Sequence, residues 1–491
     1  MEVIHLILHY LSSYYWIPLL LIYLGVILTV LIENRNPTKT IAWILVIVFL
    51  PFLGLFLYYL FGQKFTTEKR LEKINEHQLL RIQQEWGRLE PIMEEKLQEI
   101  NGRIGNLSRV YTFLKNERLS FPSLHNQVEL LINGEQKFQR LIVDLLAASH
   151  SIHMEYYIFE IDTIGKEILN ILEKKAEEGV RVRIIIDSFG SPNLHKYLKR
   201  KKKNIHFSWT GFLPVTFTSL ANSNYRNHRK IAVIDGKIGY TGGINIADRY
   251  INLKENKGVY WRDTAVRVVG DSVAMLQLNF WNSWMQASSE PFHLDKSYIL
   301  GVEVAGSEGN AAVSYVSSNP GSKGPYNMEA LLISIGEANK KIQLVTPYYI
   351  PSEELETALM IAAASGVEVE IILPKSSDSF FVQHASFSFL KPLLKRGVKV
   401  YLYDKGFIHA KTVNVDDKVS FIGTVNLDTR SFYINYEIAA VVADPKLCQD
   451  MNQQFQIDKG HSKQLTLEGW LARSKWKRGI DSLCRLLAPL L

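Results

Sequence analysis

Two copies of one short pattern carry the side chains in this sequence that could do chemistry. Each copy has a histidine, a lysine two residues later and an aspartate five residues after the lysine: His228, Lys230 and Asp235, then His409, Lys411 and Asp416. Each copy also leads to a glycine and, three residues further, to an asparagine: Gly242 and Asn245, then Gly423 and Asn426. Displacement at a phosphodiester needs two imidazoles, one to attack phosphorus and one to supply a proton. A repeated half-site can deliver one imidazole from each half.

The apolar residues around both copies are typical of β-strands, in which side chains two positions apart point to the same face. His228 and Lys230 therefore share a face, as do His409 and Lys411. If the halves pack about a pseudo-two-fold axis, both pairs meet in one cleft, where the lysines can hold the non-bridging oxygens of a phosphate. One imidazole then forms a covalent phosphohistidine, and the other protonates the leaving alkoxide and deprotonates the incoming nucleophile. Splitting the displacement into two steps needs no metal, and the sequence shows no convincing cluster of metal ligands, so we expect neither a metal nor another cofactor.

Four further residues are candidates for supporting roles: Asn245, Asn426, Asp263 and Glu437. The two asparagines can donate hydrogen bonds to the same phosphate. A carboxylate follows each motif, Asp263 after the first and Glu437 after the second, and its bond to the far imidazole nitrogen would fix the tautomer and stabilise the imidazolium. Asp235 and Asp416 are an odd number of residues from their lysines and therefore lie on the other strand face. We expect these two aspartates to bind backbone or neighbouring groups rather than phosphate.

Strand-like and helix-like segments alternate around the motifs, and the order occurs twice. Each set consists of a strand, a helix and a buried strand: 151–159, 163–178 and 180–186, then 341–350, 353–365 and 367–373. Gly179 and Gly366 follow the helices as C-terminal stops. The letters Tyr156-Tyr157-Ile158 also recur as Tyr348-Tyr349-Ile350. The pattern predicts an α/β fold of two pseudo-symmetric αβα halves, residues 121–300 and 301–465, that form one catalytic domain.

Two apolar runs near the start of the sequence, 17–32 and 41–61, each approach the roughly 20 residues that a membrane-spanning helix needs. We therefore expect residues 1–62 to form a transmembrane helical hairpin, with two buried core helices as the alternative. Basic residues beyond the second run predict that the large domain is cytoplasmic. Residues 63–120 are charged and periodic, which predicts a helical linker. Residues 466–491 form a basic amphipathic tail that either lies on an anionic membrane or docks on the core.

The net charge of +7 favours a polyanionic partner, either nucleic acid or an anionic lipid surface. The expected hairpin favours anionic membrane lipids, so we predict no nucleic-acid partner. The two cysteines, Cys448 and Cys484, do not resemble a disulfide or metal framework. No feature of the sequence marks an oligomeric state.

The doubled H-x-K-x4-D motif resembles the signature of the phospholipase D superfamily over roughly residues 120–465. Further segments are similar to bacterial cardiolipin synthases: 33–43, 51–54, 59–62, 133–135, 152–159 and 488–491. The resemblance implies two phospholipase D-like halves that convert two phosphatidylglycerol molecules to cardiolipin and glycerol at the bacterial cell membrane. It also implies that His228 is the nucleophile and His409 the acid and base.

Two other classes of function remain open. The first is a different enzyme of the same chemistry: a phospholipase D-type hydrolase, a related phosphatidyltransferase or a membrane-tethered nuclease. A nuclease is expected to place aromatic stacking surfaces beside a basic groove. The second is a non-catalytic membrane scaffold, which would be expected to have lost at least one motif, whereas both are intact.

Overall fold

The computed structural model describes residues 14, 16–33, 37–58, 90–201, 204–212, 224–252, 259–288 and 309–488. The chain divides into two compact units: residues 1–73 with 215–224, and residues 74–214 with 225–491. Each unit is described by itself. The predicted boundary between the halves, at residues 300 and 301, lies outside the described residues.

Among its described residues, the first unit contains three apolar helices: α2 (Trp16–Glu33), α3 (Pro37–Phe49) and α4 (Pro51–Leu57). Pro51 divides the second apolar run, because proline provides no backbone N–H to continue the helix of α3. Gly54 of α4 packs so closely on α3 that an added Cβ would lie 2.5 Å from the carbonyl oxygen of Val46. The expected pair of spanning helices is not seen: in the described part of the chain, no helix combines the length and apolar character of a membrane span.

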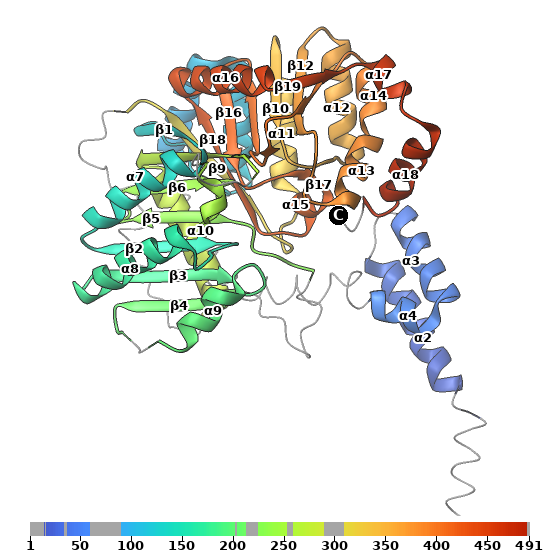
Figure 1. Cartoon of the computed structure of the whole chain (residues 1–491), viewed down its shortest axis with the longest axis horizontal. Coiled ribbons are helices and arrows are strands. Elements are labelled where there is room, and N and C mark those ends of the chain that lie inside the picture. Colours follow the sequence, from blue (N-terminus) through green and yellow to red (C-terminus); the bar gives the residue numbers. More distant parts are fainter. Residues whose placement is uncertain are drawn as a thin grey trace, which may run out of the picture. The chain divides into compact units, whose positions relative to one another are not determined.

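The first half of the second unit is a seven-stranded mixed sheet with the order β1-β8-β6-β5-β2-β3-β4 (Figure 1). Its strands are β1 (Asn126–Ile132), β2 (Ser151–Tyr156), β3 (Arg181–Asp187), β4 (Phe207–Phe212), β5 (Lys230–Ile234), β6 (Ile238–Gly242) and β8 (Thr264–Gly270). Its helices are α7 (Asn133–Ala147), α8 (Thr163–Glu177), α9 (Pro192–Lys199) and α10 (Val273–Ala287). The apolar faces of α7 and α8 cover the sheet because Leu141, Leu145, Ile168 and Leu172 are buried in one cluster with strand residues.

The second half repeats this plan as an eight-stranded sheet with the order β19-β13-β12-β10-β15-β16-β18-β9. Its strands are β9 (Ala312–Ser318), β10 (Lys341–Val345), β12 (Glu368–Pro374), β13 (Lys399–Tyr403), β15 (Thr412–Val415), β16 (Val419–Gly423), β18 (Glu437–Ala443) and β19 (Ser462–Leu465). Its helices are α11 (Tyr326–Gly336), α12 (Glu353–Ala364), α13 (Phe380–Ser388), α14 (Leu390–Lys395), α15 (Thr429–Tyr433), α16 (Pro445–Gly460), α17 (Leu467–Leu471) and α18 (Lys475–Arg485). The prediction of a doubled α/β fold is confirmed.

The strand register corrects one sequence match between the halves. Tyr156 of β2 is opposite Lys230, whereas Val345 of β10 is opposite Thr412, so Thr346 is the residue that follows the register opposite Lys411. The structural counterpart of Tyr156 is therefore Thr346 and not Tyr348. The matching letters are displaced by two residues, a shift that keeps the same strand face and escapes notice in the sequence.

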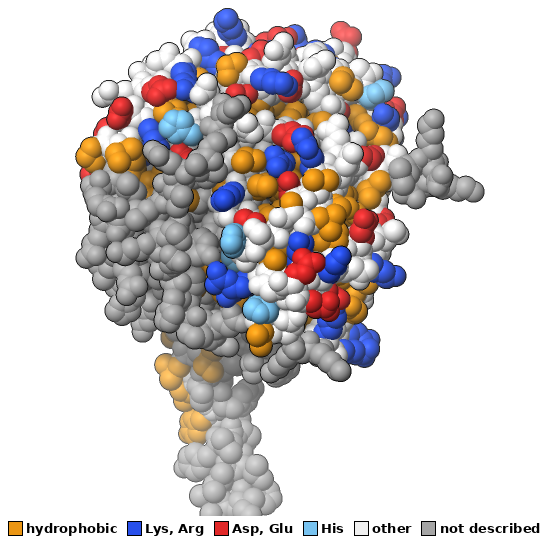
Figure 2. All heavy atoms as spheres, turned by 90° about the vertical axis from the view of Figure 1, so that its left-hand side faces the viewer, with side chains coloured by type: hydrophobic (Ala, Val, Ile, Leu, Met, Phe, Trp, Pro, Cys, Tyr) orange, Lys and Arg blue, Asp and Glu red, His pale blue; other side chains and the backbone are white. Residues whose placement is uncertain are grey.

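The two sheets share one hydrophobic core. Ile231, Val266 and Val268 of the first sheet are buried in the same cluster as Ile438 and Val442 of the second. This common core explains why both halves belong to one compact unit. On the face that Figure 2 shows, basic and acidic side chains are interspersed with smaller groups of apolar side chains.

The predicted linker is partly a component of the second half. Residues 90–104 are helical and lead through Gly105–Ser108 into α6 (Arg109–Asn116). Leu97, Ile100 and Leu114 are buried in the core of the second half, and the Tyr111 hydroxyl donates to the carbonyl oxygens of Ala312 and Val441 at 3.1 and 3.2 Å. The interpretation of this segment as a connecting helix alone was incomplete, because its apolar stripe packs on a sheet that begins only at residue 312.

Candidate active site

The backbone brings the segment before each histidine next to the other half. The N–H of His228 donates to the carbonyl oxygen of Tyr436 at 3.0 Å, and the N–H of His409 donates to that of Arg262 at 2.7 Å. The second contact belongs to a short parallel pair of β14 (Phe407–Ile408) and β7 (Trp261–Arg262). Tyr436 immediately precedes Glu437, and Arg262 immediately precedes Asp263. Each histidine therefore lies beside an acidic residue of the opposite half.

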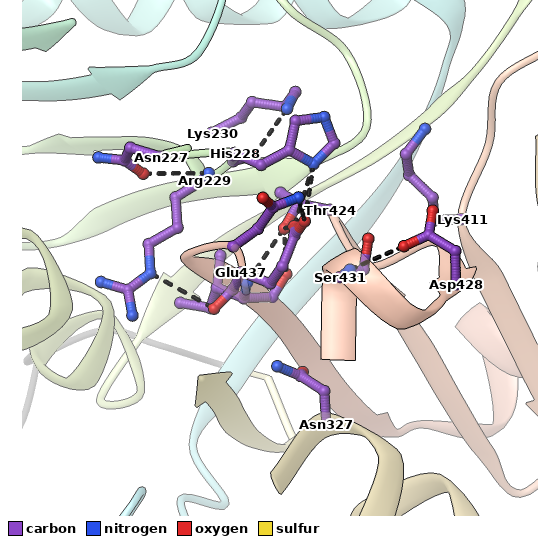
Figure 3. Close-up of polar contacts among 12 residues, drawn as sticks. Asn227, His228, Arg229, Lys230, Asn327, Lys411, Thr424, Asp428, Ser431 and Glu437 are labelled. Carbon is purple, nitrogen blue, oxygen red and sulfur yellow. Dashed lines mark hydrogen bonds and ion pairs between the residues drawn. The ribbon is translucent and has the colours of Figure 1, made fainter. Parts of the chain in front are cut away.

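Each imidazole is hydrogen-bonded to that carboxylate. His228 Nδ1 lies 3.0 and 3.1 Å from Glu437 Oε1 and Oε2 (Figure 3), and His409 Nδ1 lies 2.7 Å from Asp263 Oδ2. The acids are therefore exchanged between the halves, which the order of residues along the chain does not reveal. Both carboxylate side chains are 0% exposed, whereas the imidazoles of His228 and His409 are 13% and 10% exposed. Because Nδ1 is occupied, Nε2 is the nitrogen of each ring that can react.

The two carboxylates are accommodated by different neighbours. A Cβ added at Gly243 would lie 2.1 Å from Asp263 Oδ1, so only glycine leaves room for this acid. In the second half Thr424 takes the equivalent position, directly after the glycine of the motif, and its hydroxyl donates to Glu437. The replacement of the second glycine by threonine thus provides an additional donor to the longer acid.

The lysines bind the backbone of their own motifs. Lys230 Nζ donates to the carbonyl oxygen of His228 at 2.7 Å, and Lys411 Nζ donates to that of His409 at 2.5 Å. Burial lowers the pKa of Lys230 to about 7 and that of Lys411 to about 8. A bound phosphate anion would favour the charged form of both lysines, because an opposite charge stabilises the ammonium.

The crossed histidine–carboxylate contacts bring both motifs to the junction of the halves, where their charges affect one another. Burial lowers the pKa of His228, and the charges of both Lys230 and Lys411 lower it further. Burial likewise lowers the pKa of His409 to about 4, again with contributions from both lysines. Each lysine therefore acts on the histidine of the other half as well as its own.

The orienting acids remain ionised despite their burial. Burial would raise the pKa of Asp263, but the imidazole of His409 and the charge of Lys411 outweigh it and hold this pKa below its ordinary value. Burial would also raise the pKa of Glu437, but the imidazole of His228 and the charge of Lys230 hold this pKa below its ordinary value. An ionised carboxylate at Nδ1 stabilises the imidazolium that forms whenever the ring accepts a proton.

The motif aspartates bind backbone groups of neighbouring loops. Asp235 and Asp416 each accept hydrogen bonds of 2.7–2.9 Å from three successive backbone N–H groups: Ser149, His150 and Ser151 for the first, and Asn339, Lys340 and Lys341 for the second. Both aspartates have a positive φ, 51° and 54°. They fix the turn after the strand of each motif to the start of a neighbouring strand.

The two asparagines are not equivalent. Asn245 accepts from the N–H of Ile158 at 3.1 Å and donates to the Tyr250 hydroxyl at 2.8 Å, so its amide is held within the scaffold. Asn426 is also buried, but its Oδ1 has no hydrogen-bond partner among the described residues. Asn426 Oδ1 is therefore available to accept a hydrogen bond from a ligand hydroxyl, but this oxygen cannot donate to a phosphate.

Sequence reasoning did not assign a role to Asn133, which positions one of the acids. Its N–H donates to the carbonyl oxygen of Asp263 at 2.9 Å, and its Oδ1 accepts from the N–H of Asp263 at 3.0 Å. Its φ of 60° is unusual for a residue with a side chain. An asparagine before Gly134, directly after a strand, is a sequence signal for a turn, but nothing in the sequence connects Asn133 with Asp263.

Aromatic rings form the immediate surroundings of both imidazoles. The ring centroid of Tyr157 lies 5.2 Å from that of His228, and the centroids of Trp261 and Phe407 lie 5.5 and 5.8 Å from that of His409.

Within the described ranges, no group of three or more His, Cys, Asp or Glu side chains is arranged to hold a metal ion.

Comparison with known proteins agrees with this geometry. The family described as "Cardiolipin synthase, PLD-like domain" matches residues 141–284 and 331–459, one segment in each half. A second family, "Phospholipase_D-nuclease N-terminal", matches residues 20–63. A phosphatidylserine synthase from Haemophilus influenzae Rd KW20 has a similar fold, with a TM-score of 0.58 and 18% identity, covering 79% of this chain and 100% of that one.

Curated relatives are similar over almost the full length. Cardiolipin synthase 1 of Bacillus anthracis is 37% identical, covering 98% of this chain and 95% of the relative. The major cardiolipin synthase ClsA of Bacillus subtilis (strain 168) is 37% identical, covering 95% and 97% respectively. With both halves matched and both histidine–lysine pairs in one site, the chain belongs to the cardiolipin synthase family of phospholipase D-like proteins.

Proposed function

We propose that this protein is a cardiolipin synthase, which transfers the phosphatidyl group of one phosphatidylglycerol to the glycerol hydroxyl of another and releases glycerol. The observation that carries the proposal is the pair of imidazoles with exchanged acids, held beside two lysines in one site. Similarity to cardiolipin synthases over nearly the whole chain supports the choice of substrate.

In the first step, Nε2 of neutral His228 attacks phosphorus. A nitrogen–phosphorus bond forms, the bond from phosphorus to the glycerol oxygen breaks, and His409 Nε2–H gives its proton to the leaving alkoxide. Lys230 and Lys411 neutralise the non-bridging oxygens. The products are a phosphatidyl-histidine and free glycerol.

In the second step, the glycerol hydroxyl of another phosphatidylglycerol replaces the histidine. His409 accepts the hydroxyl proton while the oxygen–phosphorus bond forms and the nitrogen–phosphorus bond to His228 breaks. Asp263 stabilises the imidazolium of His409, and Glu437 holds His228 in the tautomer that presents Nε2. The site returns to its starting protonation, so the cycle needs no net proton.

The order of the two histidines rests on resemblance to the family. Burial lowers the pKa of His409 to about 4, which by itself makes His409 at least as ready as His228 to act as a neutral nucleophile. Peptide mapping of a trapped phosphatidyl-enzyme tests the order. A label on His228 supports the proposal, and a label on His409 reverses the two roles while leaving the chemistry intact.

We propose further that the apolar helices of the first unit anchor the protein in the bacterial cell membrane, with the catalytic domain on the cytoplasmic side. The match of residues 20–63 to an N-terminal family supports the anchor. Large apolar side chains of these helices are exposed, among them Leu21 at 64%, Ile32 at 71% and Phe49 at 75%, and lipid would cover them. Protease accessibility of the catalytic domain in oriented membrane vesicles tests the side.

The reaction is tested with the detergent-purified full chain and phosphatidylglycerol, with and without chelator. Cardiolipin and glycerol in equal amounts, with no loss on chelation, support the proposal. Phosphatidic acid as the main product would assign a hydrolase, and absence of turnover would assign a scaffold. His228→Ala and His409→Ala should each abolish transfer, and full activity in either variant would contradict the two-imidazole mechanism.

A further inference from the structure

Helix α13 exposes two large apolar side chains at its start. Phe380 and Phe381 are 58% and 53% exposed, and their rings stack edge to face at 5.7 Å. They follow directly on Ser379, whose side chain accepts from the N–H of Val382 and caps the helix. The cap fixes the start of the helix, and therefore the position from which both phenylalanine side chains project into solvent.

Helix α18 packs alongside α13 (Figure 1). Cys484 of α18 and Ala385 of α13 are buried together with Ile350, and His384 Nδ1 lies 2.7 Å from Asp481 Oδ1. Arg473 Nη1 contacts the other oxygen of Asp481 at 2.7 Å. The tail of the chain is therefore docked on the second half, which was one of the two alternatives predicted from its sequence.

Docking leaves a second apolar face of α18 uncovered. Trp476 and Leu483 share one face of the helix because they are seven residues apart, and they are 79% and 67% exposed. Leu487, in the turn just beyond the helix, is 37% exposed. Lys475 and Lys477 flank the tryptophan and are exposed. A helix with one docked face, one bare apolar face and basic residues beside it has the pattern of an interfacial membrane helix.

The start of α13 lies next to the catalytic residues. Asp378, two residues before Phe380, accepts hydrogen bonds of 2.8 Å at both carboxylate oxygens from the Tyr348 hydroxyl. The carbonyl oxygen of Tyr348 accepts from the Thr346 hydroxyl at 2.8 Å, and that hydroxyl accepts from the N–H of Leu427 at 3.3 Å, directly after Asn426 of the second motif. The exposed phenylalanines are therefore at the border of the site and not at a remote surface.

We propose that Phe380, Phe381, Trp476, Leu483 and Leu487, with Lys475 and Lys477, form a docking face that seats the active site on an anionic phospholipid bilayer. The apolar side chains enter the region between head groups and acyl chains, and the lysines contact anionic head groups. The docking face brings the opening of the site to the level at which the phosphodiester of a membrane lipid lies. This inference deepens the proposed function and rests on its lipid substrate.

The choice of a bilayer over a protein partner rests on composition. The docking face combines tryptophan, phenylalanine and leucine with positive charge, and Asp481, the acidic residue of α18, is turned inward to His384 and Arg473. Negative charge is thus withdrawn from the helix that would meet the lipid. Aromatic side chains favour the membrane interface because one end of the ring system is apolar and the other polar.

The test compares one enzyme on two forms of phosphatidylglycerol: long-chain lipid in nanodiscs and short-chain lipid dispersed as monomers. Trp476→Glu with Leu483→Glu, and separately Phe380→Glu with Phe381→Glu, should lower cardiolipin formation on nanodiscs by roughly tenfold or more. Turnover of monomeric lipid should stay at the level of the unsubstituted chain. Ile361→Glu, on α12 and 60% exposed, is the matched control and should change neither rate.

Hydrogen exchange provides a readout that does not depend on activity. Backbone amides of 378–384 and 475–487 in the full chain should gain protection in nanodiscs that contain phosphatidylglycerol relative to nanodiscs of phosphatidylcholine alone. Lys475→Gln with Lys477→Gln should reduce this difference. The docking face would be overturned if the glutamate variants lost activity equally on nanodiscs and on monomeric lipid. Equal protection from exchange in nanodiscs with and without phosphatidylglycerol would also overturn it. Failure of the unsubstituted chain to make cardiolipin would instead overturn the proposed function and leave the exchange result to decide the docking.

Discussion

Substitution of Asp263 by asparagine tests the exchange of acids between the halves. Asparagine keeps the size of the side chain and the acceptor for the N–H of Thr264, but it removes the charge 2.7 Å from His409 Nδ1. A hydrogen bond to a charged partner contributes about 1.5–3 kcal/mol. Because about 1.4 kcal/mol is tenfold in rate, we expect Asp263→Asn to lower kcat by about 10- to 150-fold.

The assay uses a phosphatidyl substrate with a weakly basic p-nitrophenolate leaving group, which departs without a proton from the enzyme. The burst of p-nitrophenolate measures formation of the phosphatidyl-enzyme alone. The histidine that acts as general acid becomes dispensable for the burst, while the nucleophile does not. Of the two variants His228→Asn and His409→Asn, we therefore expect one to keep the burst with this substrate and the other to lose it.

The structure requires Asp263→Asn to behave like His409→Asn, and Glu437→Gln to behave like His228→Asn. This requirement holds whichever histidine is the nucleophile. Asp450→Asn, a partly exposed aspartate of α16 paired with Lys446, is the control and should leave the burst unchanged. If Asp263→Asn groups with the variant of His228, which belongs to its own half, the exchanged pairing is refuted.

Three further predictions follow from the same geometry. Lys230 and Lys411 must both be protonated to bind phosphate, and their pKa values are lowered to about 7 and about 8. We therefore expect kcat/KM to fall as the pH rises above about 7, and more steeply above about 8, well below the ordinary pKa of lysine. A flat profile to pH 10, measured by initial rates, would contradict this. Asp416→Ala removes three hydrogen bonds from backbone N–H groups at the start of β10. It should lower the free energy of unfolding by about 1–3 kcal/mol in denaturant titrations, while activity per folded molecule is retained. Loss of activity without loss of stability would place the residue in catalysis. Gly243→Ala places a Cβ against the carboxylate of Asp263 and should lower kcat at least about tenfold without a large change in thermal stability; unchanged kcat would show that the carboxylate can move without consequence.

The doubled motif and the alternation of strands and helices were readable because both depend on local periodicity and side-chain type. The spacing of His228, Lys230 and Asp235 predicted that Asp235 binds backbone groups, and its carboxylate does accept from the N–H of His150. The structure begins β5 only at Lys230 and places Asp235 in the turn after that strand, so the argument from strand faces does not apply to His228 or Asp235. The helix stops and buried strands follow from glycine and from β-branched runs in the same way. Each of these inferences involves residues only a few positions apart.

Equal sequence positions did not mean equal surroundings. Asn245 and Asn426 follow their motifs at the same distance, yet only Asn245 is hydrogen-bonded to a tyrosine of the scaffold. Thr346, and not a tyrosine, occupies the counterpart of Tyr156. These differences arise from residues outside the motifs, which the pattern of the motifs does not include.

The sequence by itself determined the chemistry: two histidine–lysine pairs for phosphoryl transfer, on two copies of an α/β fold, with Asp263 and Glu437 as the available acids. Only the tertiary structure decided which acid serves which histidine, across separations of 146 and 209 residues. The physical reason is that this pairing depends on how two sheets pack through a common core and on backbone hydrogen bonds exchanged between the halves. Such contacts join residues far apart in the chain, and no local period or propensity encodes them.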